Sequence, residues 1–222
     1  MDNVEDIIKS RHSVREYLSK EIESEKVDRL NETIESINKE EQLNIQLVIN
    51  NPEAFDKFIL HYGRLKNASN YIALIGRKTE NLEEKIGYSG EKIVLIAQSL
   101  GLNTCWVAGT YSKGNVKAII NSGEKLVCII AIGYGANQGV NRKMKSFSDV
   151  SLSTDVPNWY RRGVEFALYS PTAMNEQKYK FELISERKVM LKPGIGPMTR
   201  IDKGIVKYHF ELGAGKENFE WA

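Results

Sequence analysis

The chain has 222 residues, of which 41% are hydrophobic and 27% are charged, a balance typical of a globular protein and not of a disordered one. Its 31 lysine and arginine residues nearly cancel its 29 aspartate and glutamate residues, for a formal net charge of +2. A charge so close to zero argues against binding to nucleic acid or to a membrane surface, so any anion-binding site must be a local cluster.

The first part of the chain alternates helix and strand patterns. Residues 4–9 are expected to form a short helix. Apolar residues at spacings of three and four predict an amphipathic helix over 24–38, with Ser24 as its N-cap. Residues 44–49 alternate apolar and polar, and residues 71–75 are almost continuously apolar, so each predicts a strand.

The middle of the chain contains its most hydrophobic stretches. Residues 81–100 predict a long helix with a buried middle, and Gly101 is its expected end. A short strand is expected at 106–108 and a helix at 116–120. Residues 126–132 are the most hydrophobic run and predict a buried central strand.

The last part of the chain begins with a loop over 136–145 that carries several basic residues. A helix is expected at 157–169 and a strand at 180–185. Prolines and glycines predict a tight loop at 193–197, followed by a helix over 201–212.

The order of these elements suggests an internal repeat of helix, strand, long helix, glycine stop and aromatic residue. The matching landmarks are Gly90, Gly101 and Trp106 in the first part and Gly204, Gly215 and Trp221 in the second. The second long helix is expected to end at Gly213 or Gly215. We therefore predict a first half over residues 1–150 and a shorter second half over 151–222, packed together as one unit.

The two cysteines and the N-terminal sequence indicate the cellular compartment in which the protein is expected to lie. Cys105 and Cys128 both lie in apolar surroundings and are expected to be buried structural thiols in a reducing environment. No apolar run is long enough to span a bilayer, and the acidic N-terminus lacks the pattern of a secretory signal. A cytoplasmic location is therefore expected.

The three histidines, His12, His61 and His209, show no metal-ligand spacing with cysteines or carboxylates. No metal site is therefore expected. His209 falls inside a predicted helix and is expected to be packed there.

A basic group follows the first predicted helix. Arg11 and Arg15 can hold a terminal phosphate with paired, charge-assisted hydrogen bonds. Ser13 can add a hydroxyl donor and His12 a ring N–H. Taken alone, these residues also fit a solvated basic turn.

A loop of small and amide residues, Ser170 to Gln177, closes a predicted helix and precedes a predicted strand. Small residues let the backbone approach a planar ring closely. The amides of Asn175 and Gln177 can pair with a ring edge or fix the loop itself. An ordinary Ser-Pro turn is the other interpretation. The candidate contact residues are Pro171, Thr172, Ala173, Met174, Asn175 and Gln177.

Together these segments resemble the flavin mononucleotide (FMN) site of the nitroreductase family. In that family a phosphate-binding stretch opens the chain and a loop, usually Pro-Ser-x-x-Asn-x-Gln, lies along the flavin ring, each from a different subunit of a dimer. Here the two stretches lie far apart in one chain, so the resemblance is closest to a fused single-chain branch. Lys178 stands where the family usually has proline.

Two further stretches carry the resemblance. Residues 101–109 are similar to the family's Gly-Leu-Gly-x-x-Trp segment, which implies that backbone N–H groups of Val107, Ala108 and Gly109 face the flavin ring. Basic residues after the central strand resemble a cluster that returns to the phosphate. Lys143 and Lys145 are the better pair there and Arg142 is the alternative, although a solvated basic loop also fits.

The resemblance implies an α+β nitroreductase-like fold, with mixed, mostly antiparallel sheets flanked by helices, arranged as a pseudo-dimer. It implies noncovalent FMN, and hydride transfer from NADH or NADPH through FMN to a nitroaromatic, a quinone or a similar small-molecule acceptor. No catalytic side chain is implied, because the flavin carries the chemistry.

The fused arrangement implies one FMN per chain and one vestigial site. The first half has no matching loop at residues 36–40, and the second has no Arg-x-Ser-x-Arg stretch after Asp155. Two alternatives are a non-catalytic protein that binds or senses a flavin or nucleotide, and a structural relative that binds no cofactor. A monomeric pseudo-dimer is expected, and whether chains pair into a further homodimer is left open.

Overall fold

The computed structural model describes residues 3–56 and 65–222, so His61 lies outside the described residues. The chain divides into two compact units, each of which is described by itself. Unit 1 consists of Met1–Lys9, Glu83–Glu91 and Arg142–Ala222, and unit 2 of Ser10–Leu82 and Lys92–Asn141. The division into sequence halves at residue 150 stays a prediction.

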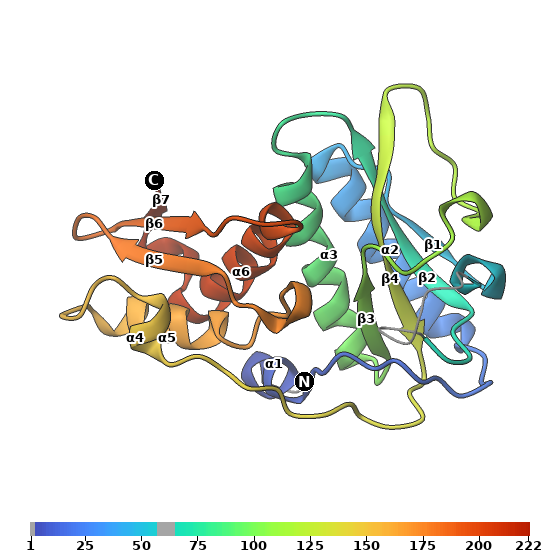
Figure 1. Ribbon diagram of the computed structural model, residues 1–222, viewed down its shortest axis with the longest axis horizontal. Helices are drawn as coiled ribbons and strands as arrows, with labels where there is room; N and C mark the ends of the chain where they lie inside the picture. The colour runs from blue at the N-terminus through green and yellow to red at the C-terminus, as the bar shows by residue number, and fades with distance from the viewer. Residues whose placement is uncertain (1–2, 57–64) are drawn as a thin grey trace. The chain divides into compact units, whose positions relative to one another are not determined.

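Unit 2 is built on a four-stranded antiparallel sheet with the order β1-β2-β4-β3 (Figure 1). The strands are β1 (Gln46–Val48), β2 (Asn70–Arg77), β3 (Asn103–Val107) and β4 (Glu124–Gly133). The most hydrophobic run is a central strand, β4, as predicted, and it pairs with β2 and β3. The first predicted strand is shorter than expected, and the third begins three residues earlier.

The core of unit 2 explains why β2 is apolar at every position. Tyr71, Ala73 and Ile75 pack with the alternate residues of β4 in one cluster. Because side chains alternate along a strand, Ile72 and Leu74 point to the opposite face, and they too are fully buried. Helix α2 (Ser24–Glu41) packs near β1 and buries Leu30, Ile34 and Ile37, the stripe that predicted it.

Two local predictions in unit 2 are wrong. Ser24 is not the cap of α2, because Glu23 occupies that position and Ser24 is the first helical residue. Residues 116–120 are not helical. Side chains from neighbouring strands hold this segment extended: the Lys117 N–H donates to the Tyr71 hydroxyl at 2.9 Å, and the Ile119 N–H donates to Gln46 at 2.9 Å.

Unit 1 combines helices with a three-stranded sheet of order β5-β6-β7, in which β5 and β6 form an antiparallel hairpin (Figure 1). Strands β6 and β7 and the short helix α4 were not predicted. The elements are α1 (Val4–Ser10), α4 (Phe147–Val150), α5 (Asn158–Ala167), β5 (Tyr179–Leu183), β6 (Lys188–Pro193), α6 (Thr199–Ala214) and β7 (Glu220–Trp221). Short 3-10 turns occur at Pro52–Phe55, Lys113–Asn115, Ala173–Asn175 and Lys216–Asn218.

An aromatic cluster forms the core of unit 1. Phe210 of α6 stacks on Phe181 of β5 with ring centroids 4.8 Å apart, and meets Phe219 edge-on at 5.0 Å. Tyr160 of α5 contacts the same ring at 5.8 Å. Full burial of a side chain of this size contributes about 1.5–3 kcal/mol, so these rings fix the helices against the hairpin.

Helix α3 (Leu82–Ser99) gives its first turns to unit 1, where they cross α6. A methyl group at Gly204 would overlap the carbonyl oxygen of Glu84, and one at Gly87 would overlap the carbonyl oxygen of Ile201. The two backbones therefore approach closely only because both positions lack a side chain. Each long helix is followed by a glycine with positive φ: Gly101 (+73°) after α3, as predicted, and Gly215 (+77°) after α6.

The crossing also buries polar groups. His209 Nε2 lies 2.9 Å from Glu91 Oε1, and both side chains are fully buried, so His209 is packed in a helix as predicted. Cys105 and Cys128 are buried free thiols, also as predicted. Within the described residues, no helix has the length and apolar character needed to cross a membrane.

The close approach of α3 and α6 predicts how a substitution at Gly204 changes the stability of the protein. We expect Gly204→Ala to lower the free energy of unfolding by about 1–3 kcal/mol, the usual cost of overpacking, although alanine is the better helix former by about 1 kcal/mol. Urea unfolding measures the change. Gly114→Ala, where an added methyl group meets no atom within 4 Å, is the control and should be nearly neutral. An unfolding midpoint for Gly204→Ala at or above that of the wild type would contradict the prediction.

Candidate functional site

The predicted phosphate-binding residues lie beside strand β3 in unit 2. Ser13 pairs with Thr104 in a parallel bridge, and the Val14 N–H donates to the Thr104 carbonyl oxygen at 3.0 Å. Arg11 is buried and Arg15 is exposed. Backbone pairing thus brings the N-terminal segment to a strand that is distant in sequence.

The Cys105 thiol shows how this basic group is arranged. Burial raises the pKa of Cys105, and the positive charges of Arg15 and Arg11, together with a hydrogen bond from Ser13, act in the opposite direction. The side chains of Arg11, Ser13 and Arg15 therefore all influence the Cys105 thiol in β3. Three of the four residues predicted to hold a phosphate are grouped in the structure.

His12, the fourth residue, packs against a turn of the loop that follows β4. Gly139 has φ of +79°, and a methyl group there would overlap the Cβ atom of His12. The half-buried imidazole therefore stands beside backbone that only glycine can provide.

The residues expected to face the flavin ring lie at and just after the end of β3. Val107 is the last paired residue, opposite Ile129, and its side chain is buried. Ala108 and Gly109 follow outside the strand, and a methyl group at Gly109 would meet no atom within 4 Å. Space next to this backbone is what a closely approaching planar ring requires.

In unit 1, the loop from Ser170 to Gln177 has an unusual backbone; it is called the flavin loop after the role that the resemblance predicts for it. Met174, Asn175 and Gln177 have φ values of +51°, +56° and +48°. A left-handed conformation costs roughly 1–2 kcal/mol for a residue with a side chain. Such strain persists only where surrounding contacts fix it, and it gathers at functional sites.

The amides of the flavin loop bind the predicted basic cluster. Asn175 Nδ2 and Gln177 Nε2 both donate to the Lys143 carbonyl oxygen, at 2.8 and 3.0 Å. The Lys145 N–H donates to Gln177 Oε1 at 3.0 Å, and Lys145 Nζ donates to the Gln177 carbonyl oxygen at 2.8 Å. The structure thus brings the two motifs together, with the amides fixing the loop.

The three basic residues of that cluster differ in their surroundings. Arg142 donates to the Leu168 carbonyl oxygen at 3.4 Å, and Lys145 binds the flavin loop. The Lys143 side chain is exposed. Lys143 and Lys145 therefore flank the loop more closely than Arg142 does, although which of them would contact a phosphate stays a prediction.

Asp202, in the first turn of α6, contacts the candidate loop and was not identified from the sequence. Its two carboxylate oxygens accept the Ala173 N–H at 3.0 and 3.2 Å, and its side chain is 8% exposed. Burial, with a smaller contribution from Glu176, raises the pKa of Asp202 to about 7 against the effect of the Ala173 hydrogen bond. An acid near a helix start is common, so no sequence signal marked this one.

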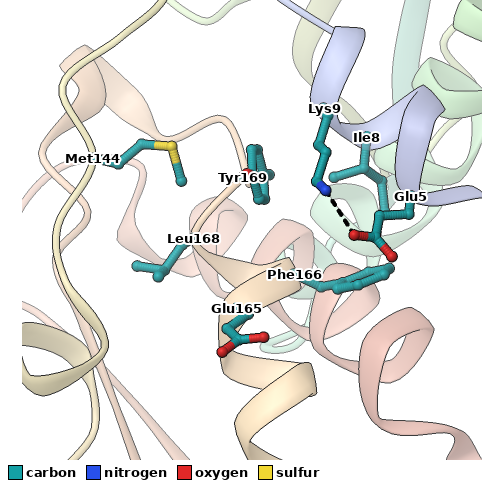
Figure 2. A pocket seen from close by; sticks show the side chains of 8 residues that line it. All are labelled: Glu5, Ile8, Lys9, Met144, Glu165, Phe166, Leu168 and Tyr169. Atoms are coloured by element: carbon teal, nitrogen blue, oxygen red, sulfur yellow. Dashed lines mark hydrogen bonds and ion pairs between the residues drawn. The ribbon is translucent and has the colours of Figure 1, made fainter.

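Unit 1 has a pocket of about 240 Å³ beside the helix end that leads into the flavin loop, and Figure 2 shows the side chains that line it. Its polar wall contains the Lys9–Glu5 ion pair at 2.7 Å. Ligand pockets usually exceed about 300 Å³, so this one suits a single ring and not a whole flavin. Its apolar and aromatic wall is formed by Ile8, Met144, Phe166, Leu168 and Tyr169.

The donor sets fit FMN in kind. Two guanidinium groups and a hydroxyl in unit 2 match the needs of a phosphate, and unit 1 offers a tethered loop of small residues. Ser170 Oγ, at the start of that loop, is buried and has no hydrogen-bond partner among the described residues. Each set is assembled within its own unit, and the joining of the two sets into one site stays a prediction.

Comparisons with solved structures show what the fold is similar to. A "putative nitroreductase" from Thermotoga maritima aligns over 95% of this chain and 83% of its own, with 22% identity and a TM-score of 0.67. A "putative NADH dehydrogenase/NAD(P)H nitroreductase" from Bacteroides thetaiotaomicron aligns over 68% of this chain and 97% of its own, with 23% identity and a TM-score of 0.53. A "putative NADH oxidase" from Clostridium acetobutylicum aligns over 67% of this chain and 99% of its own, with 22% identity and a TM-score of 0.52.

The predicted α+β nitroreductase-like fold is confirmed by these alignments, whereas the internal repeat stays a prediction. No curated protein matches the chain. A family model described as "Putative TM nitroreductase" matches residues 3–214, nearly the whole sequence. The chain therefore belongs to this nitroreductase family.

Proposed function

We propose that the protein is an FMN-dependent oxidoreductase, in which the flavin passes a hydride from NADH or NADPH to a nitroaromatic, a quinone or a similar acceptor. Membership of the nitroreductase family supports the reaction class. The names of the similar proteins from Bacteroides thetaiotaomicron and Clostridium acetobutylicum, which refer to NADH or NAD(P)H, support the donor.

One observation carries the proposal: motifs predicted separately from the sequence meet in pairs within each unit. In unit 2, the Arg11–Arg15 group lies beside β3, and a methyl group added at Gly109, just after the end of that strand, would meet no atom within 4 Å. In unit 1, Lys143 and Lys145 bind the flavin loop. Neither pairing follows from sequence proximity, and both are what one flavin site would need.

The chain's own residues would bind and orient. Arg11 and Arg15 would hold the phosphate, with Ser13 as a neutral donor. Backbone N–H groups after Val107 would face the ring and favour negative charge on it. When bound, FMN would supply the redox chemistry of hydride acceptance and release. The small pocket of Figure 2, with its apolar and aromatic wall, is a candidate to receive one ring of the acceptor.

Two features support a fused pseudo-dimer. The similar proteins from Bacteroides thetaiotaomicron and Clostridium acetobutylicum are almost wholly aligned, yet they cover only 68% and 67% of this chain. The α3–α6 crossing is reciprocal, because Gly87 faces the carbonyl of Ile201 and Gly204 faces that of Glu84. Such a contact is typical of elements related by a two-fold axis, with Gly87 in place of Gly90 as the counterpart of Gly204.

Anaerobic reduction tests the proposal directly. The protein is loaded with FMN, and NADH or NADPH is added while the flavin absorbance is followed. Rapid bleaching, followed by recovery on addition of a quinone or nitroaromatic, is expected. Tight FMN binding without reduction by either nicotinamide would instead favour the non-catalytic flavin-binding protein. Failure to bind FMN at all would leave a structural relative that binds no cofactor.

Arg15→Ala should weaken FMN binding by about 1.5–3 kcal/mol, the scale of a hydrogen bond to a charged group. Arg15 is exposed, so the substitution should leave folding intact. Fluorescence titration with FMN gives the dissociation constant. Arg29→Ala is the matched control, because Arg29 is an exposed α2 residue paired with Glu32 and should not affect affinity. Equal affinity for Arg15→Ala and wild type would remove Arg15 from the site.

Titration to saturation should give one FMN per chain. Only one set of motifs is complete, since residues 36–40 lie within α2 and form no loop. Flavin released by heat and quantified against protein provides an independent measure. Two equivalents of FMN per chain would contradict the prediction of a vestigial second site.

A further inference from the structure

Asp202 differs from the usual acid in the first turn of a helix. Such a side chain ordinarily caps the helix or faces solvent near its positive end. Here α6 has no side-chain cap, and both Asp202 oxygens turn to the Ala173 N–H in the flavin loop. The carboxylate is thus committed to a segment outside its own helix.

The hydrogen bond falls at the point where the loop most needs support. Ala173 directly precedes Met174 and Asn175, both left-handed, and the Met174 side chain is 75% exposed, so packing does not hold it. The Gln177 N–H is held separately by Thr172 Oγ1 at 3.0 Å. Asp202 therefore provides the tether on the N-terminal side of the strained residues.

Placing a carboxylate there is unfavourable. Burial raises the pKa of Asp202 to about 7, and Glu176 in the loop adds repulsion. The charge of Asp202 also contributes to raising the pKa of Tyr179 in β5, and Arg142 acts on that phenol in the opposite direction. Lys203, the next residue of α6, is paired with Glu84 at 2.7 Å. A buried acid kept at such a cost beside a candidate ligand loop is typical of a functional position.

We propose that Asp202 is the positioning residue of the flavin loop, and that its carboxyl group accepts the Ala173 N–H so that residues 172–177 keep the conformation that FMN would contact. This inference rests on the proposed function and adds to it a residue outside the family motifs. Asp202 acts through the loop backbone and takes no part in electron transfer.

The stability of the loop held by the Ala173–Asp202 hydrogen bond is expected to depend on pH in a defined direction. Opening the loop would expose Asp202 and return its pKa towards the ordinary value of 3.8, so opening releases a proton. The closed loop is therefore most stable at low pH, and this stabilisation is lost as the pH rises towards 7. Above about pH 7 the carboxyl is ionised in both states, and the dependence levels off.

Amide hydrogen exchange on the FMN-free protein, followed residue by residue by NMR, tests the proposal. In the wild type, protection of the Ala173 amide, corrected for intrinsic exchange, should fall between pH 5 and pH 7 by up to about tenfold per unit. Asp202→Asn keeps an oxygen acceptor without the ionisation, so protection should persist and lose its pH dependence. Asp202→Ala should lose protection at every pH.

Asp149→Asn is the matched control, because Asp149 accepts the Ser146 N–H at 2.8 Å in unit 1 but does not touch the flavin loop. It should leave exchange at Ala173 unchanged. Equal Ala173 protection in Asp202→Ala and wild type would overturn the proposal.

FMN titration separates this proposal from the proposed function. Asp202→Ala should bind FMN at least about tenfold more weakly than wild type, and Asp202→Asn should restore most of the affinity. If wild type binds FMN and Asp202→Ala binds it equally well, the role of Asp202 fails while the function stands. If wild type binds no FMN, the function fails, and the exchange data still decide whether Asp202 holds the loop.

Discussion

Unit 1 depends on the close approach of two helix backbones at Gly87 and Gly204. The contact leaves no room for a side chain at either position, so it fixes the height and rotation of α6. From that position the first turn of α6 presents Asp202 to the flavin loop, and its later turns present His209 to Glu91. A steric constraint in the helix pair thereby sets the geometry of a loop that neither glycine touches.

Much of the fold could be predicted because hydrophobic patterning is strong where burial is complete. Strands β2 and β4 are buried on both faces, and their continuous apolar runs identified them. Residues 116–120 were misread because their conformation depends on Tyr71 and Gln46, which hydrogen-bond to their backbone from other strands. Strand β6 was missed because it carries exposed lysines and gains its partners only in the folded hairpin.

The candidate site could be predicted to the extent that its residues form contiguous motifs. The groups around Arg11 and Asn175 stand out because several unusual residue types occur within a few positions. The pairing of the flavin loop with Lys143 depends on backbone carbonyl groups, which carry no sequence signature. Asp202 was missed for the same reason. Its carboxyl group accepts the backbone N–H of Ala173, which is distant in sequence, and its local sequence suggests only a helix start.

The surroundings of Cys105 have a consequence for the lifetime of the protein. In the folded state the thiol is 4% exposed, and burial outweighs the acidifying effect of Arg11 and Arg15. If β3 separated from its neighbours, water would reach the thiol and remove the burial effect that raises its pKa. The exposed thiol would then be accessible to oxidants. Transient opening of this strand would thus be a route to irreversible inactivation, and the integrity of the fold would protect against chemical ageing.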